Sequence, residues 1–270
     1  MSLPPQLPLG EAVARYTADG DAVYIGNFGT QLYAVGHELI RQRRRRLHAV
    51  LPSGGLLLDQ LLGAGCVDAA TFGHCWSSIG PRPAWNFRRR YEQGLREEER
   101  WHELSLGAIN AALTAGAWRV PFMPIPGLPG TAYLTEDLAA GWMETVSSPF
   151  GSATVVQAIR PDVAFIYADR ADRWGNAVVA GPHGDTLIAA QAADRVIVVA
   201  EELVSDDELR SSQANVPGVI VSSVVVAPDA VRPDGAEGRY PRDIAAIEEY
   251  VRRSATREGF EQWLAAEVFT

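Results

Sequence analysis

The feature that most restricts the fold of this chain is a series of continuous apolar runs that end in turns. The runs 163–167 and 196–200 are apolar throughout, and 219–226 is mostly apolar. Such runs are typical of parallel strands that are buried on both faces. Nearer the N-terminus, 22–25 and 47–51 each run into a glycine-rich turn that is followed by helical spacing. This alternation predicts an α/β fold, a mostly parallel open sheet with helices on both faces.

The remaining segments predict helices and two interruptions. Apolar spacing favours helices over 33–46 and 57–62, and an amphipathic helical region over 243–269. The segment 81–100 is dense in arginine, glutamate and aromatic residues, and 121–135 is rich in proline and glycine. We interpret both as surface excursions from one sheet. The predicted organisation is therefore a single domain over residues 1–270.

Composition excludes several classes of protein. The net charge of −9 argues against a nucleic-acid surface, and no apolar run reaches the roughly 18 residues of a membrane span. All 24 basic residues are arginine, so lysine Schiff-base and Walker-A chemistry are excluded in this chain. The first ten residues lack the basic and apolar regions of a signal peptide, and we expect a cytoplasmic protein. Cys66 and Cys75 are too few for a metal site and are interpreted as buried thiols, so no bound metal is expected.

Two glycine-rich turns are candidate binding elements. Each follows a predicted strand and opens onto a helix, where glycine lets a ligand approach the backbone and the helix N-terminus favours anions. The full dinucleotide-binding spacing is missing, so tight βα turns remain an equal interpretation. Together, the turns could form one crevice for a phosphate or a thioester carbonyl. The turns consist of Gly26, Asn27, Phe28 and Gly29, and of Ser53, Gly54 and Gly55.

Glu103 is the candidate catalytic carboxylate. The sequence pattern places it in the first turn of a helix that continues through Leu113, where an acidic residue normally compensates the helix dipole. The neighbouring Trp101 could instead desolvate Glu103 and raise its pKa, as a general base near neutral pH requires. On the second interpretation, Glu103 faces an internal and partly apolar cavity.

The most distinctive segment is Asp-Arg-Trp-Gly-Asn at 172–176, which follows a predicted strand. Alternating aspartate and arginine over 169–173 indicates local ion pairs that fix a loop. The same segment belongs to a longer set of motifs that spans roughly residues 10 to 250. The other members are 19–21, 26–28, 37–41, 53–55, 61–65, 121–124, Gly181, 192–199, 201–204 and 239–243.

With these motifs the sequence resembles the A (α) subunits of family I coenzyme A transferases, of the glutaconate CoA-transferase type. The resemblance implies an acyl-CoA substrate, no permanently bound cofactor, and a partner B (β) subunit in a heterodimer that assembles into a heterotetramer or larger. In this family the glutamate that forms the acyl anhydride and the CoA thioester lies in the B part. Its sequence context is not found here, and the pair Glu201 and Glu202 is interpreted as structural.

A second branch with the same two-part architecture consists of steroid-degradation CoA hydrolases. In that branch the resemblance implies a catalytic glutamate in the A (α) chain, and its position here is Glu103. Transferases of this type tend to have an aromatic residue and then serine or threonine after this glutamate, so Leu104 departs from the pattern, and Asn27 stands where many relatives have glycine. Transferase subunit, hydrolase subunit with Glu103 as base, and non-catalytic scaffold subunit therefore stay open.

Overall fold

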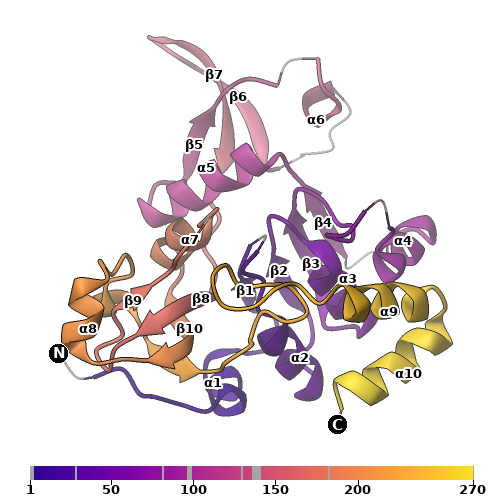
Figure 1. Ribbon diagram of the computed structural model, residues 1–270. Coiled ribbons are helices and arrows are strands. Elements are labelled where there is room, and N and C mark those ends of the chain that lie inside the picture. The colour runs from indigo at the N-terminus through magenta and orange to yellow at the C-terminus, as the bar shows by residue number, and fades with distance from the viewer. Residues whose placement is uncertain are drawn as a thin grey trace.

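The computed structural model describes residues 3–27, 29–80, 82–95, 99–128, 130–135, 141–181 and 183–269. Within these residues, eight strands form the main sheet (Figure 1). They are β1 (Ala22–Ile25), β2 (Leu47–Val50), β3 (Val67–Phe72), β4 (Arg100–Glu103), β8 (Val163–Ala171), β9 (Ala177–Val178), β10 (Arg195–Leu203) and β11 (Ser223–Val226).

The strand order is β11-β10-β8-β1-β2-β3-β4, and all neighbours in this series are parallel. Within the described sheet, only β9 pairs in the antiparallel sense, against the end of β8. Successive residues of a strand point to opposite faces. Val23 and Phe165 accordingly join one hydrophobic cluster, whereas Tyr24 and Ala164 join the other. The predicted parallel α/β sheet, buried on both faces, is confirmed.

Helices cover both faces of the sheet. One face carries α1 (Leu9–Tyr16), α2 (Tyr33–Arg41), α3 (Gly55–Gly63), α4 (Trp85–Glu92), α9 (Ile244–Ser254) and α10 (Arg257–Glu267). The other face carries α5 (Leu106–Ala117) and α7 (Thr186–Ala192), which pack against each other. A short helix, α8 (Asp206–Ser211), follows β10.

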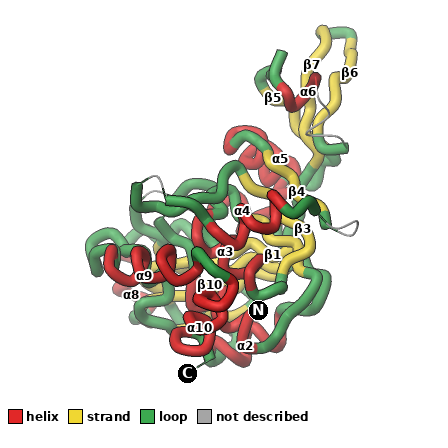
Figure 2. Tube along the Cα trace, turned by 90° about the vertical axis from the view of Figure 1, so that its right-hand side faces the viewer, coloured by secondary structure: helices red, strands yellow, loops and turns green. Residues whose placement is uncertain are grey.

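A second, antiparallel sheet of three strands stands away from the body above α5 (Figures 1 and 2). It consists of β5 (Phe122–Ile125), β6 (Met143–Ser148) and β7 (Gly151–Gln157), with α6 (Ala132–Thr135) beside it. Met143 and Val156 at the base of this sheet are buried, whereas Phe150 at its tip is fully exposed. The segment 121–135, expected to be a surface excursion from the main sheet, therefore supplies one strand of a separate sheet and a short helix beside it.

Three predicted boundaries are wrong for local reasons. The helix expected over 33–46 ends at Arg41, because Arg43 adopts a left-handed conformation and the Arg44 amide turns back to the Leu39 carbonyl. The run 219–226 is a strand only over β11 and begins as the 3-10 helix η1 (Gly218–Ile220). The C-terminal helical region is divided at Thr256, whose hydroxyl caps α10.

The described helices include none with both the length and the apolar character needed to cross a membrane.

Candidate functional site

The candidate site lies at the carboxyl edge of the main sheet, where the strand order reverses. From β1 the chain proceeds through β2 and β3 to β4 on one side, whereas β8, β10 and β11 extend on the other. In open α/β sheets, ligands bind at the carboxyl ends of the strands next to such a reversal. Gly26 directly follows β1, at the boundary between β8 and β1.

Gly26 has a positive φ of 84° in a turn that excludes any side chain. A Cβ atom at this position would lie 2.1 Å from the Thr30 carbonyl oxygen. The Thr30 amide donates to the Asn27 carbonyl oxygen at 2.8 Å and closes the turn. Gly29 also has a positive φ, of 79°, but a Cβ there would meet open space. Phe28, the third predicted residue of this turn, lies outside the described residues.

The second turn lies beside the first, because β1 and β2 are paired neighbours. Gln31 joins the two turns, since its side-chain amide donates to the carbonyl oxygens of Ser53 and Gly54, to the latter at 3.2 Å. Gly55 has a φ of 56°, and a Cβ there would lie 2.9 Å from Gln31 Oε1. The prediction that both glycine turns lie at the carboxyl ends of adjacent strands is confirmed. The role of Gln31 was missed, because a contact between a side chain and a distant backbone leaves no signal in sequence spacing.

The Asn27 side chain is engaged within the protein. Its Nδ2 donates to Asp185 Oδ2 at 2.9 Å, and Asn110 Nδ2 donates to Asp185 Oδ1 at 2.6 Å. Burial raises the pKa of Asp185, and the Asn110 hydrogen bond opposes that rise. Asn27 therefore links the β1 turn to the start of α7 across the reversal of strand order. Neither Asp185 nor Asn110 was identified from the sequence.

Glu103 is the last residue of β4, at the open edge of the main sheet. It is exposed, so the expected internal cavity is wrong for the single chain. The expected position in the first turn of a helix is also wrong, because Ser105 caps a helix that begins at Leu106. Burial raises the pKa of Tyr133 and the negative charge of Glu103 raises it further, which places the two side chains near each other.

The segment 172–176 is a loop fixed by hydrogen bonds rather than by ion pairs among its own residues. Asp172 accepts from the backbone amides of Trp174 and Asn176 at 2.8 and 2.9 Å. Arg173 instead pairs with Asp206 at 3.2 Å, so the expected local ion pairs are wrong. The aspartate caps its own turn, which leaves the arginine free to reach α8.

The pair Glu201 and Glu202 is held in place at the end of β10. Both Glu201 oxygens accept hydrogen bonds, from the Tyr240 hydroxyl at 2.6 Å and the Asp229 amide at 2.9 Å. Glu202 accepts from Arg239 at 2.8 Å. The structural interpretation of this pair agrees with these contacts.

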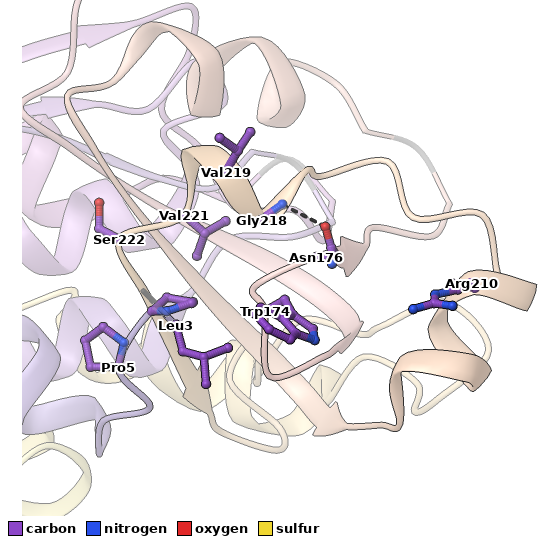
Figure 3. Close-up of a pocket in the computed structure, with 10 residues that line it drawn as sticks. Leu3, Pro5, Trp174, Asn176, Arg210, Gly218, Val219, Val221 and Ser222 are labelled. Carbon is purple, nitrogen blue, oxygen red and sulfur yellow. Dashed lines mark hydrogen bonds between the residues drawn. The ribbon is translucent and has the colours of Figure 1, made fainter. Parts of the chain in front are cut away.

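A hollow of about 720 Å³ lies elsewhere, between the N-terminal segment and the loop 172–176 (Figure 3). The exposed Trp174 lines it together with Gly218 and Asn176, and the Gly218 amide donates to Asn176 Oδ1 at 2.9 Å. The hollow shares no lining residue with either glycine turn or with Glu103. We place the candidate site at the strand ends and not in this hollow, because the strand ends bring together main-chain turns and a carboxylate.

The part of the chain that the structure describes contains no group of three or more histidine, cysteine, aspartate or glutamate residues that could hold a metal ion. Both cysteines are free, and burial raises the pKa of the Cys66 thiol to about 11. The described site therefore consists of backbone turns, amide side chains and one exposed carboxylate.

The fold defines the class as an open α/β protein with glycine turns at the carboxyl ends of its strands, and comparison with known proteins identifies the family. The coenzyme A transferase family matches residues 8–227. This chain is 33% identical to the A chain of 3-oxoadipate CoA-transferase from Pseudomonas knackmussii, over 96% of this chain and 91% of that protein. It is 30% identical to the cholesterol ring-cleaving hydrolase IpdA subunit of Mycobacterium tuberculosis, over 80% of this chain and 76% of that protein. The chain belongs to the coenzyme A transferase family.

Solved structures agree with this placement. Glutaconate coenzyme A-transferase from Acidaminococcus fermentans superposes with a TM-score of 0.89 at 26% identity, over 97% of this chain and 88% of that chain. A variant of the decarboxylase AibA/AibB superposes with a TM-score of 0.83 at 29% identity, over 98% of this chain and all of that chain. Proteins similar to this chain thus include a transferase, a hydrolase and a decarboxylase. The activity of this chain has to be inferred from its site, because a fold alone does not define a function.

Proposed function

We propose that this chain is the A (α) component of a heteromeric acyl-CoA:carboxylate CoA-transferase whose nucleophilic glutamate lies on a partner B subunit. The observation that carries the proposal is the pair of glycine turns at adjacent strand ends, in a chain that matches the family over residues 8–227. Glu201 is an unsuitable nucleophile, because both of its oxygens accept hydrogen bonds within the chain. The proposal therefore assigns the carboxylate that attacks the thioester to the partner.

The chemistry is nucleophilic catalysis, which divides one difficult step into easier ones. The partner carboxylate attacks the thioester carbonyl, and CoA leaves as a thiolate while an acyl-glutamyl anhydride forms. The thiolate then attacks the glutamyl carbonyl and releases the first carboxylate, leaving CoA on the partner glutamate. An acceptor carboxylate reverses the sequence. Acyl-CoA is the substrate and no resident cofactor takes part.

Within this scheme, this chain binds and orients the thioester. The helix α3 begins at the second turn without a side-chain cap, so its first amides and the positive end of its dipole are directed to the strand ends. Oriented amides of this kind stabilise the oxyanion that forms when a carbonyl is attacked. Gly29, with open space around it, lets a substrate approach the neighbouring backbone.

A hydrolase is the second candidate, because a relative of 30% identity carries a hydrolase name and Glu103 is an exposed carboxylate at the same sheet edge. Here Glu103 acts as general base on a water molecule that attacks the acyl-CoA. A scaffold subunit with no group in the reaction is the third candidate.

Substitution of Glu103 in the complex with the B-type subunit distinguishes these candidates. Under the transferase proposal, Glu103→Ala alters the preference for acyl groups but leaves CoA transfer measurable. Loss of all turnover supports the hydrolase, and an unchanged enzyme supports the scaffold. Glu258→Gln, which alters an exposed glutamate in the first turn of α10, is the matched control.

The partner is expected to form a heterodimer with this chain, and heterodimers to associate into a heterotetramer or larger. Light scattering after size-exclusion chromatography of the co-expressed subunits measures this stoichiometry. A cytoplasmic location suits an enzyme whose substrate is an acyl-CoA.

A further inference from the structure

A histidine lies between the glycine turns and Glu103 at the same sheet edge, and the proposed function gives it no role. His74 follows β3 by two residues and forms a parallel bridge with Ser53. Its carbonyl oxygen accepts from the Gly54 amide at 3.0 Å, and a Cβ on Gly54 would lie 2.9 Å from that oxygen. Because β3 lies between β2 and β4, His74 occupies the middle of the edge that runs from Ser53 to Glu103.

The imidazole of His74 is stacked on the indole of Trp76. The ring centroids are 4.2 Å apart and the ring planes differ by 14°. Trp76 is 57% exposed, and its backbone is paired with Pro83 in an antiparallel bridge. Within the described part of the chain, His74 is the one aromatic ring packed on Trp76. A large planar side chain is thus held in a fixed orientation while much of its surface faces solvent.

His74 also carries an unused polar atom. Its Nδ1 is buried, and no group of the described chain forms a hydrogen bond with it. Two other imidazoles are paired, His48 with Thr71 at 2.8 Å and His37 with Gln60 at 3.0 Å, whereas His183 Nδ1 is also buried without a partner in the described chain. Burial lowers the pKa of His74, so the ring is neutral at pH 7 and its nitrogens offer one donor and one acceptor. A buried polar atom without a partner is unfavourable unless a ligand completes it.

The strand spacing allows an acyl group bound at the Ser53 turn to reach this stack. Adjacent strands are separated by about 4.8 Å, so the ends of β2 and β4 lie roughly 10 Å apart. If the thioester lies at the Ser53 turn, as the proposed function requires, its acyl group extends past His74 and Trp76 toward Glu103. Aromatic surfaces favour other planar π systems in offset or edge contacts, beyond the area that they bury.

We propose that His74 and Trp76 form the wall of the acyl site and select acyl-CoA substrates whose acyl group is planar and conjugated to the thioester. Trp76 stacks on the conjugated group, and His74 forms a hydrogen bond with a carbonyl oxygen of the same planar system. The inference deepens the proposed function, because it names the class of acyl group.

Calorimetric binding to the complex with the B-type subunit tests the inference, with two thioesters that differ by one double bond. Cinnamoyl-CoA is planar, whereas 3-phenylpropanoyl-CoA carries the same ring on a saturated linker. We expect about a fivefold preference for cinnamoyl-CoA, within the range that aromatic pairs contribute. Trp76→Leu reduces the preference to less than about twofold, and Trp76→Phe retains most of it. His74→Phe weakens the binding of both thioesters and preserves the preference, because it keeps the ring but removes the nitrogen.

Trp118→Leu is the matched control, because Trp118 is also exposed, at 68%, but lies at the far end of α5 from Glu103. It should leave the preference unchanged. Cinnamoyl-pantetheine lacks adenine. It therefore tests whether the group stacked on Trp76 is the acyl group or the adenine of CoA. If the Trp76→Leu effect disappears with this probe, the stacked group is adenine and the acyl assignment is wrong.

Two other results would overturn the inference while leaving the proposed function intact. In the first, Trp76→Leu keeps the full preference for cinnamoyl-CoA. In the second, Trp76→Leu dissociates the complex on size exclusion, and the complex that remains keeps the wild-type preference. Failure of the wild-type complex to bind or turn over any acyl-CoA would instead remove the proposed function, and the inference with it.

Discussion

At the scale of single residues, Gly26 is the position at which the site depends most strictly on backbone conformation. Gly26→Ala combines the cost of a left-handed conformation for an L-residue with a contact of 2.1 Å to the Thr30 carbonyl oxygen. We expect a loss of about 2–5 kcal/mol in the free energy of unfolding, measured by urea denaturation. Gly29→Ala is the control, with a similar φ but open space, and should cost only about 1–2 kcal/mol. Equal losses in the two variants would show that the tight turn does not matter.

Gln31 supports a second prediction at this scale. Gln31→Leu removes the donor shared by the Ser53 and Gly54 carbonyl oxygens in a buried region. The Gly54 oxygen keeps the Leu58 amide at 3.0 Å, whereas the Ser53 oxygen loses its side-chain donor. The expected loss of stability is about 1–3 kcal/mol, because buried acceptors without partners keep their desolvation cost. Gln42→Leu removes a comparable bond, to the Gly10 carbonyl oxygen at 2.7 Å, at a partly exposed position away from the strand ends. Acyl-CoA affinity of the complex should fall in the first variant only, and a fall in both would argue against a specific role for Gln31.

At the scale of secondary-structure elements, His37 joins three helices and makes their packing dependent on pH. It lies in α2, binds Gln60 of α3 at 3.0 Å, and contacts the Trp263 ring of α10 edge-on. Burial lowers the pKa of His37 from 6.5 to about 4, the Gln60 hydrogen bond opposes this, and Arg41 adds to it. Between these values the unfolded chain binds a proton that the folded chain does not, so stability is complete above pH 6.5 and falls as the pH approaches 4.

The variant His37→Gln keeps an amide opposite Gln60 and removes the titration. Wild type should lose up to about 3 kcal/mol more stability than this variant between pH 7 and pH 4, from the size of the pKa change. Urea denaturation at a series of pH values measures the difference. Other buried groups such as His48 titrate in both proteins and cancel in the comparison. Parallel pH profiles for the two proteins would mean that folding does not lower the pKa of His37.

The same scale explains which elements could be predicted from the sequence. The strands β8 and β10 are buried on both faces and therefore appear as uninterrupted apolar runs. The strands β4 and β6 lie at sheet edges, and their mixed exposed and buried residues look like loop sequence. Glu103 was misplaced for this reason, because an unrecognised edge strand was assigned to the helix that follows it. Gln31 and His74 gain their roles from contacts with residues about twenty positions away, which no local pattern records.

At the scale of the whole molecule, we expect the isolated chain to have no CoA-transferase activity. Of the carboxylates that end β4 and β10, Glu201 is fully engaged with Tyr240 and Asp229, and Glu202 is paired with Arg239. Glu103 is exposed at the sheet edge, where a substrate would be open to water instead of enclosed. Water exclusion strengthens the electrostatic interactions on which attack at a thioester depends, and a second subunit is needed to provide it.

Chromatography of reactions that contain an acyl-CoA donor and a free carboxylate should show transfer with both subunits and none with either alone. After borohydride reduction of the acylated complex, the reduced glutamate should be found by mass spectrometry in the B-type subunit, because that chain carries the CoA thioester. A matched control is the complex with Glu258→Gln, which should behave as wild type. Robust transfer by this chain alone, together with inactivation by hydroxylamine, would contradict the prediction. Such a result would place the nucleophile here, with Glu103 as the first residue to replace, since Glu201 and Glu202 are already held by hydrogen bonds and an ion pair.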